Sequence, residues 1–198
     1  IIVEDNGLGM TEAEVDEYIN QIAFSGAQAF MEKYKDKANE DQIIGHFGLG
    51  FYSAFMVADK VTIDTLSYQK DAVPVHWESD GGTSYEMGEG DKKESGTKIT
   101  LYLNEDSTEF SNEYRAREVI EKYCSFMPVP IYLTNSAEGP QYETIEKDEL
   151  TDKDTIVETI VEEAKTEEKE KEDGTKEVVE VSPAKEKYKI LKRPVALN

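Results

Sequence analysis

Gly45-His46-Phe47-Gly48-Leu49-Gly50 is the stretch that decides the fold, because its closely spaced glycines run directly into the apolar residues 51–58. That apolar density predicts a helix buried nearly all round. Glycines before a helix expose backbone N–H groups beside the positive end of the helix dipole, which suits a phosphate, although the same spacing also serves as a tight packing turn. The stretch is neither a Walker loop nor a Rossmann loop, so a nucleotide held here would belong to another fold.

A second motif, Asp5-Asn6-Gly7-Leu8-Gly9, follows an apolar run over residues 1–3 that is typical of a buried strand. Asp-Asn-Gly alone is most often a hairpin turn, because Asn and Gly tolerate positive φ. Here Thr11 and Glu14 form a capping box, which predicts that a helix follows instead of a returning strand. A strand-end carboxylate beside two glycines can accept a hydrogen bond from a planar amine while the bare backbone lets the ring approach. Adenine is one such ligand.

Three segments carry apolar or β-branched side chains at every second position, which predicts an antiparallel sheet with one face toward solvent. They are Val61, Ile63 and Thr65; Val73, Val75 and Trp77; and Ile99, Leu101 and Leu103. Gly96 and Thr97 begin the last segment. This pair is common at strand starts, but a threonine hydroxyl there can also reach the ligand of Asp5, directly or through a water.

Helices alternate with these strands in an order that predicts an α+β fold. We expect helices over residues 11–23, 27–34, 51–58 and 111–124, the last capped by Ser111, and a short strand over residues 131–133. The predicted architecture is a two-layer sandwich, in which helices cover one face of a mixed, mostly antiparallel sheet. The chain opens inside an apolar run and not at a methionine, so we expect the domain to be truncated at its N-terminus.

The net charge of -21 excludes non-specific binding to nucleic acid or to an anionic membrane, since both would be repelled. A single cysteine, Cys124, cannot form an internal disulfide, and no apolar run approaches the ~18 residues of a membrane helix. We therefore expect a cytoplasmic protein. Cys124 fits the apolar face of its helix as a buried thiol, and His46 and His76 lack partners at metal-ligand spacing.

The composition changes after residue 135. From residue 143 to residue 187, Glu and Lys alternate with scarcely any aromatic side chains, which is typical of a solvated segment. Residues 156–164 show helical spacing, but such a helix would be marginal without a partner. We expect a compact domain over residues 1–135, a charged linker over 136–187 and the start of another domain over 188–198.

Taken in this order, the three motifs resemble the nucleotide-binding fold shared by DNA gyrase, heat-shock protein 90, sensor histidine kinases and the MutL mismatch-repair proteins. Within that group, Ile22-Ala23-x-Ser25-Gly26-x-x-x-Phe30 and the run over residues 45–61 resemble the heat-shock protein 90 chaperones, most of all the bacterial high-temperature protein G type. The resemblance covers residues 1–135, and residues 188–198 more weakly resemble the beginning of that family's middle domain.

The resemblance implies a role for each matching position. Asp5 would bind the adenine amino group, Gly9 and Met10 would line the base pocket, and Thr97 would support Asp5. Backbone amides would reach the phosphates from Gly48, Leu49, Gly50 and Phe51. Residues 25–42 would form a lid over ATP.

The resemblance also implies an ATP-dependent chaperone that uses ATP with Mg²⁺, acts on unfolded client proteins and is a homodimer when intact. Two departures matter. Phe24 stands where the family usually carries a lysine, and the helix that supplies the catalytic glutamate and the magnesium-binding asparagine lies before Asp5, outside this sequence. We therefore expect no catalytic residue and no metal ligand in this chain, and little or no ATP hydrolysis by it alone.

Two alternatives stay open on the sequence. A histidine kinase or topoisomerase-type ATPase domain would share the fold, although the Phe51-Tyr52-Ser53-Ala54-Phe55 segment and the absence of a phospho-acceptor histidine region argue against it. An acidic protein-interaction module that binds no nucleotide would fit the charge. Binding of an ATP-competitive inhibitor at Asp5 separates the chaperone from that module.

Overall fold

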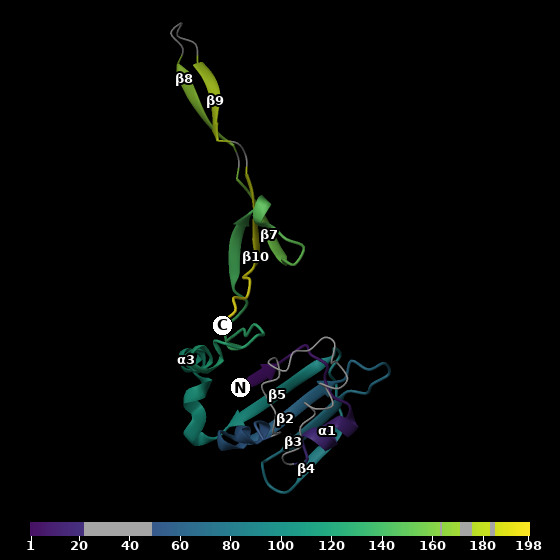
Figure 1. Cartoon of the computed structure of the whole chain (residues 1–198). Coiled ribbons are helices and arrows are strands. Elements are labelled where there is room, and N and C mark those ends of the chain that lie inside the picture. The colour runs from purple at the N-terminus through teal and green to yellow at the C-terminus, as the bar shows by residue number, and fades with distance from the viewer. Residues whose placement is uncertain (22–48, 163, 171–175, 183–184) are drawn as a thin grey trace. The chain divides into compact units, whose positions relative to one another are not determined.

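The computed structural model describes residues 1–21, 49–162, 164–170, 176–182 and 185–198. It divides into two units, Ile1–Pro128 and Val129–Asn198 (Figure 1). The helix predicted over residues 27–34 and the lid predicted over residues 25–42 lie outside the described residues.

A five-stranded antiparallel sheet organises the first unit (Figure 1). Its strands, in spatial order, are β1 (Ile2–Glu4), β5 (Gly96–Leu103), β2 (Ala58–Leu66), β3 (Val75–Ser79) and β4 (Tyr85–Glu89). The chain thus returns from β4 to insert β5 between β1 and β2, with Ile2 opposite Thr100 and Ile63 opposite Ile99. This sheet confirms the antiparallel prediction and brings the end of β1 beside the start of β5.

Helices cover one face of this sheet. The capping box of Thr11 and Glu14 forms as predicted and opens α1 (Glu12–Tyr18). Val15 from α1 packs with Ile63 and Trp77 of the sheet, and the 3₁₀ helix η2 (Phe51–Met56) adds Phe51 to the same cluster. The side chains share one apolar core, which confirms the α+β architecture.

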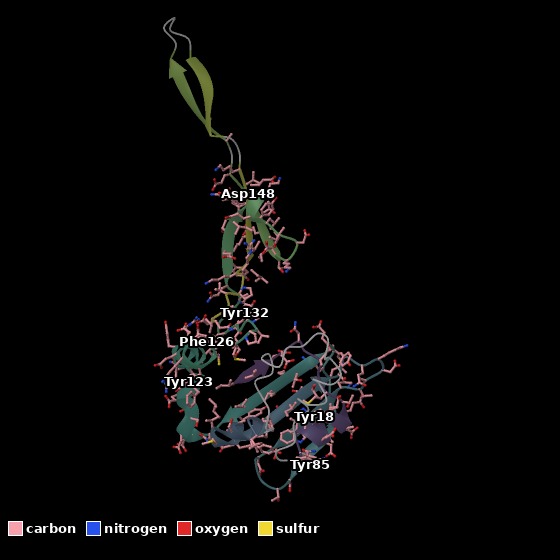
Figure 2. All side chains as sticks on the ribbon, in the orientation of Figure 1. Tyr18, Tyr85, Tyr123, Phe126, Tyr132 and Asp148 are labelled. Carbon is pink, nitrogen blue, oxygen red and sulfur yellow. The ribbon has the colours of Figure 1, made fainter. Side chains whose placement is uncertain are left out.

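Trp77 is the centre of the aromatic part of that core. Its ring meets Phe51 edge-on at 5.7 Å between centroids and stacks on Tyr85 at 6.3 Å. Tyr85 lies on the edge strand β4 (Figure 2). The indole nitrogen donates to Asn20 Oδ1 at 2.8 Å, so the one polar atom of this buried ring has a partner.

Several local predictions differ from the structure of the first unit. The apolar run over residues 1–3, predicted to be buried, is exposed, and the helix predicted over residues 11–23 ends at Tyr18. Residues 51–58 do not form one long helix, because Ala58 is buried and opens β2 opposite Leu103. The helix α3 (Glu113–Cys124) is capped by Asn112, whose side chain accepts from two backbone amides, while the Ser111 hydroxyl donates within the preceding 3₁₀ helix η3 (Glu105–Ser111). Cys124 is half-buried.

The second unit contains a three-stranded antiparallel sheet in the order β6 (Tyr142–Glu146), β10 (Lys185–Leu191), β7 (Ile156–Glu162). A 3₁₀ turn, η4 (Lys147–Glu149), follows β6, and β8 (Lys165–Glu170) pairs with β9 (Lys176–Ser182) as a separate ribbon. The buried side chains of Ile145 and Ile190 form the small core of the three-stranded sheet.

The helix predicted over residues 156–164 is wrong, because that segment pairs with β10 as a strand. Its β-branched side chains favour an extended backbone, and β10 supplies the partner that an isolated helix lacks. Residues 131–133 form no strand either: Ile131 bonds instead to the C-terminal residues Leu197 and Asn198. The three-part domain division stays a prediction.

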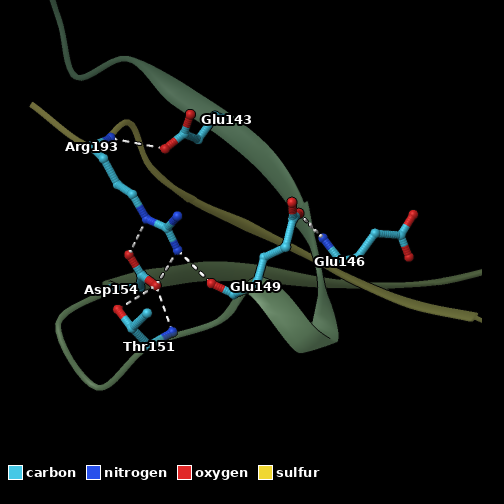
Figure 3. A network of polar contacts seen from close by, with 6 residues as sticks. All are labelled: Glu143, Glu146, Glu149, Thr151, Asp154 and Arg193. Atoms are coloured by element: carbon cyan, nitrogen blue, oxygen red, sulfur yellow. Dashed lines mark hydrogen bonds and ion pairs between the residues drawn. The ribbon is translucent and has the colours of Figure 1, made fainter. Parts of the chain in front are cut away.

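Hydrogen bonds and an ion pair surround Arg193 in the second unit (Figure 3). Its guanidinium donates to both carboxylate oxygens of Asp154 and to the backbone carbonyl of Glu149, and its backbone amide donates to Glu143. These bonds tie Arg193, two residues after the end of β10, to the loop before β7.

No helix among the described residues combines the length and the apolar character needed to cross a membrane.

Candidate functional site

The loop that leaves β1 is bonded to the start of β5. Asp5 N donates to Thr97 O at 2.9 Å, and Thr97 N donates back to Asp5 Oδ1 at 3.3 Å. Gly7 N also donates to Oδ1, at 2.8 Å. Two backbone amides therefore fix one carboxylate oxygen, while the other, Oδ2, receives no hydrogen bond from the described part of the chain. The side chain is exposed, so Oδ2 can accept from a ligand.

The same loop is pressed against the end of β2 at Gly9. This residue has φ +61°, and a Cβ added there would lie 1.9 Å from the carbonyl oxygen of Leu66. Tyr68 N donates to Leu8 O at 2.8 Å, which holds the two segments together. Only glycine fits this backbone, because a side chain would meet both the strained φ and the carbonyl.

Gly96 makes the matching contact on β5. Its φ is +126°, and a Cβ there would lie 2.2 Å from Asp5 O. The absence of a side chain lets the β1 loop pass directly over the start of β5, where Thr97 follows. The predicted adenine-site residues Asp5, Gly9, Met10 and Thr97 are thus brought together by contacts to β2 and β5.

Thr65 joins these residues and was missed as a site residue. It lies on β2 with no exposed surface, and its Oγ1 accepts from Met10 N at 2.9 Å, lies 3.1 Å from Thr97 Oγ1 and donates to Gly96 O at 3.1 Å. The sequence did hold a sign of this role: Thr65 places a hydroxyl at an inward position of β2, where Val61 and Ile63 are apolar. Such a hydroxyl needs buried partners.

The predicted phosphate-binding segment is only partly described, since Gly48 lies outside the described residues. Leu49 is half-exposed, Gly50 caps η2 with helical backbone angles, and the Phe51 ring packs on Trp77. Met10 and Phe51 pack against the same core cluster. No hydrogen bond among the described residues joins residues 49–51 to Asp5, Met10 or Thr97, and the phosphate role of residues 48–51 stays a prediction.

An open hollow of about 790 Å³ lies along α1, β3 and β4. Carboxylates line it from Glu12, Asp16 and Glu89, together with the apolar side chains of Val73 and Met87. Negative charge of this density repels phosphate groups. We therefore do not assign the hollow to a nucleotide.

The described residues contain no group of three His, Cys, Asp or Glu side chains placed to hold a metal ion. His76 pairs instead with Asp64, its Nδ1 lying 2.6 Å from Oδ1, on the face of the sheet opposite Ile63. Nearby, Lys60 bonds to Glu78 at 3.1 Å and lowers the pKa of that carboxyl. These charged side chains pair across neighbouring strands and do not converge on an ion.

Comparison with known proteins finds relatives of this chain. Residues 1–85 match the family model described as histidine kinase-, DNA gyrase B-, and HSP90-like ATPase. The chain is 51% identical to the chaperone protein HtpG of Bacteroides thetaiotaomicron and 45% identical to that of Porphyromonas gingivalis, each over 155 residues. Both alignments cover 77% of this chain and 22% of the relative, so the chain spans about a fifth of the length of these relatives.

Proposed function

We propose that this chain supplies the adenine-binding side of an ATP site in an ATP-dependent molecular chaperone. The reason is that the chain belongs to the HSP90-type chaperone family. Membership of the HSP90-like ATPases implies nucleotide binding. The residues assigned to the base are Asp5, Gly9, Met10 and Thr97.

The carboxylate of Asp5 is the observation that carries this proposal. Gly7 N and Thr97 N hold Oδ1, so the carboxylate is oriented before any ligand arrives. Oδ2 is then free to accept a hydrogen bond from the amino group of adenine, and a bond to a charged acceptor is worth more than a neutral one. Gly9 lets the loop lie directly against the end of β2, because a Cβ there would meet the Leu66 carbonyl.

The phosphate side and the lid extend the proposal along the chain. The amides of Gly48, Leu49, Gly50 and Phe51 would face the phosphates, and residues 25–42 would close over them. Support comes from the place of this segment just before η2 and from its match to the family. The Mg²⁺ that accompanies ATP would sit on the phosphates, and no described side chain is assigned to it.

The intact protein would couple ATP binding and hydrolysis to the folding of unfolded client proteins, as a cytoplasmic homodimer. The chaperone role is supported by the HtpG relatives, which are named chaperone proteins, and the homodimer by the resemblance to their family. The acidic charge of the chain supports basic or apolar client segments over nucleic acid or an anionic membrane.

Calorimetric titration tests the site. Mg-ATP and an inhibitor of the adenine pocket are titrated into this chain and into a form extended upstream as in the HtpG relatives. Asp5→Asn should weaken ATP binding about 10- to 100-fold, since it removes a charged acceptor and presents an amide N–H₂ to the adenine amino group. Glu4→Gln is the matched control, because this neighbouring carboxylate bonds to Lys92 instead. An unchanged affinity for Asp5→Asn would overturn the assignment.

A further inference from the structure

The hydroxyl of Thr65 is the hub beneath the candidate adenine site. The residue has no exposed surface, and its Oγ1 has three partners that belong to two different segments. These are the amide of Met10 at 2.9 Å, the carbonyl of Gly96 at 3.1 Å and the hydroxyl of Thr97 at 3.1 Å. One side chain therefore connects the β1 loop with both residues at the start of β5.

Counting protons sets the direction of each bond. The Thr65 hydroxyl has one proton and two lone pairs. Met10 N–H can only donate and Gly96 O can only accept, so Thr65 accepts from the first and gives its proton to the second. Its remaining lone pair faces Thr97, whose hydroxyl must then donate to it. As a result, Thr97 Oγ1 has only lone pairs left to offer a ligand.

We propose that Thr65 is a specificity-determining residue that acts through Thr97. It turns the Thr97 hydroxyl into an acceptor. The next acceptor of the site is Oδ2 of Asp5, the residue whose Oδ1 accepts from Thr97 N. Two acceptors in one site select a ligand edge that donates, such as the 6-amino group of adenine, and reject a carbonyl such as the 6-oxo group of hypoxanthine. The inference rests on the proposed nucleotide function.

The test of this inference compares the affinities for ADP and for IDP in three variants. The variants are made in the form of the protein that binds Mg-ATP. Thr65→Val removes the hydroxyl with nearly the same shape and frees the Thr97 proton, so we expect the preference for ADP over IDP to fall about 3- to 10-fold. Thr65→Ser keeps the hydroxyl and should keep the preference. Thr62→Val is the matched control, because Thr62 is also buried on β2 but faces the other side of the sheet.

Each outcome is decisive. An ADP/IDP ratio that falls in Thr65→Val and is kept in Thr65→Ser and Thr62→Val supports the inference. If Thr65→Val weakened the binding of ADP and of IDP equally, Thr65 would have only a structural role, and the inference would be overturned. If the unchanged protein binds neither nucleotide, the proposed function fails as well, which is a different result from a specific failure of Thr65.

A second measurement needs no variant and so does not depend on Thr65→Val folding. Buried hydroxyl protons are observable by NMR, and nuclear Overhauser contacts place them. We expect the Thr65 hydroxyl proton near Gly96 and the Thr97 hydroxyl proton directed at Thr65. A Thr65 proton directed at Thr97 would reverse the bond and overturn the inference.

Discussion

Arg193 donates hydrogen bonds to both carboxylate oxygens of Asp154: Nε lies 2.8 Å from Oδ1, and Nη2 lies 2.6 Å from Oδ2 (Figure 3). The Asp154 side chain is 4% exposed to solvent, whereas the Arg193 side chain is 42% exposed. Thr151 also donates to Oδ2, from its amide and from its hydroxyl. A bidentate pair of this kind fixes geometry as well as charge.

This pair makes the second unit sensitive to acid. The hydrogen bonds from Arg193, and then those from Thr151, hold the pKa of Asp154 well below its usual range. A carboxyl with a lowered pKa contributes stability that is full above its unfolded pKa of about 3.9 and is lost as the pH falls toward the folded value. We therefore expect the second unit to lose stability below about pH 4. Thermal melting followed by NMR between pH 2 and 7 measures this.

The Asp154→Asn variant should lose that acid-dependent part, since its side chain does not titrate. Arg193→Lys should also lower the melting midpoint at neutral pH, because lysine cannot bond both oxygens in the same plane. Asp148→Asn is the control, as Asp148 is exposed in the same unit (Figure 2). A pH profile of Asp154→Asn that matches the unchanged protein would contradict the role of the pair.

Gly9→Ala should destabilise the first unit. The new Cβ would meet the Leu66 carbonyl at 1.9 Å, and φ +61° is unfavourable for alanine, so we expect a loss of about 1–3 kcal/mol in the free energy of unfolding. Gly88→Ala on β4 is the matched control, because nothing lies within 4 Å of its added Cβ. Urea unfolding measures both, and equal stability of the two variants would refute the close contact.

Asn112→Ala separates the observed helix cap from the predicted one. Asn112 Oδ1 accepts from Tyr114 N at 2.9 Å and from Arg115 N at 3.3 Å, so removing it should cost about 1 kcal/mol. Ser111→Ala should cost less, since its hydroxyl donates to Thr108 O in an exposed turn. NMR shifts of the first turn of α3 and urea unfolding report the difference. A larger loss for Ser111→Ala would restore the cap predicted from the sequence.

The parts of the fold that could be predicted are those whose signal is local. Alternation around Ile63, Trp77 and Ile99 predicted β2, β3 and β5, because each strand hides one face. Thr11 and Glu14 predicted the start of α1 through bonds made within four residues. Gly9 was predicted to leave the backbone bare for a ligand, but in the structure the Leu66 carbonyl fills the place of its missing Cβ.

The parts that could not be predicted depend on partners distant in the chain. β4 has a largely exposed face and little apolar pattern, and it forms because β3 offers an edge and Trp77 stacks on Tyr85. β7 lies within the tract that reads as solvated by composition, but β10 pairs with it and Lys187 bonds to Glu162 at 2.8 Å. The inward position of Thr65 was visible in the alternation of β2, but its partners were not, since they come from β5 and from the β1 loop.

Asn20→Ala tests whether the core depends on the polar atom of its only tryptophan. Trp77 is 4% exposed, and its Nε1 donates to Asn20 Oδ1 at 2.8 Å. Alanine would leave a buried N–H without this acceptor, which should cost about 1–3 kcal/mol in the free energy of unfolding. Because the chain has a single tryptophan, its fluorescence reports both the unfolding curve and the changed surroundings of the indole. Glu17→Ala, exposed on α1, is the control, and it should leave stability and emission unchanged. If Asn20→Ala behaved like this control, the indole bond would contribute nothing to the packing of α1 on the sheet.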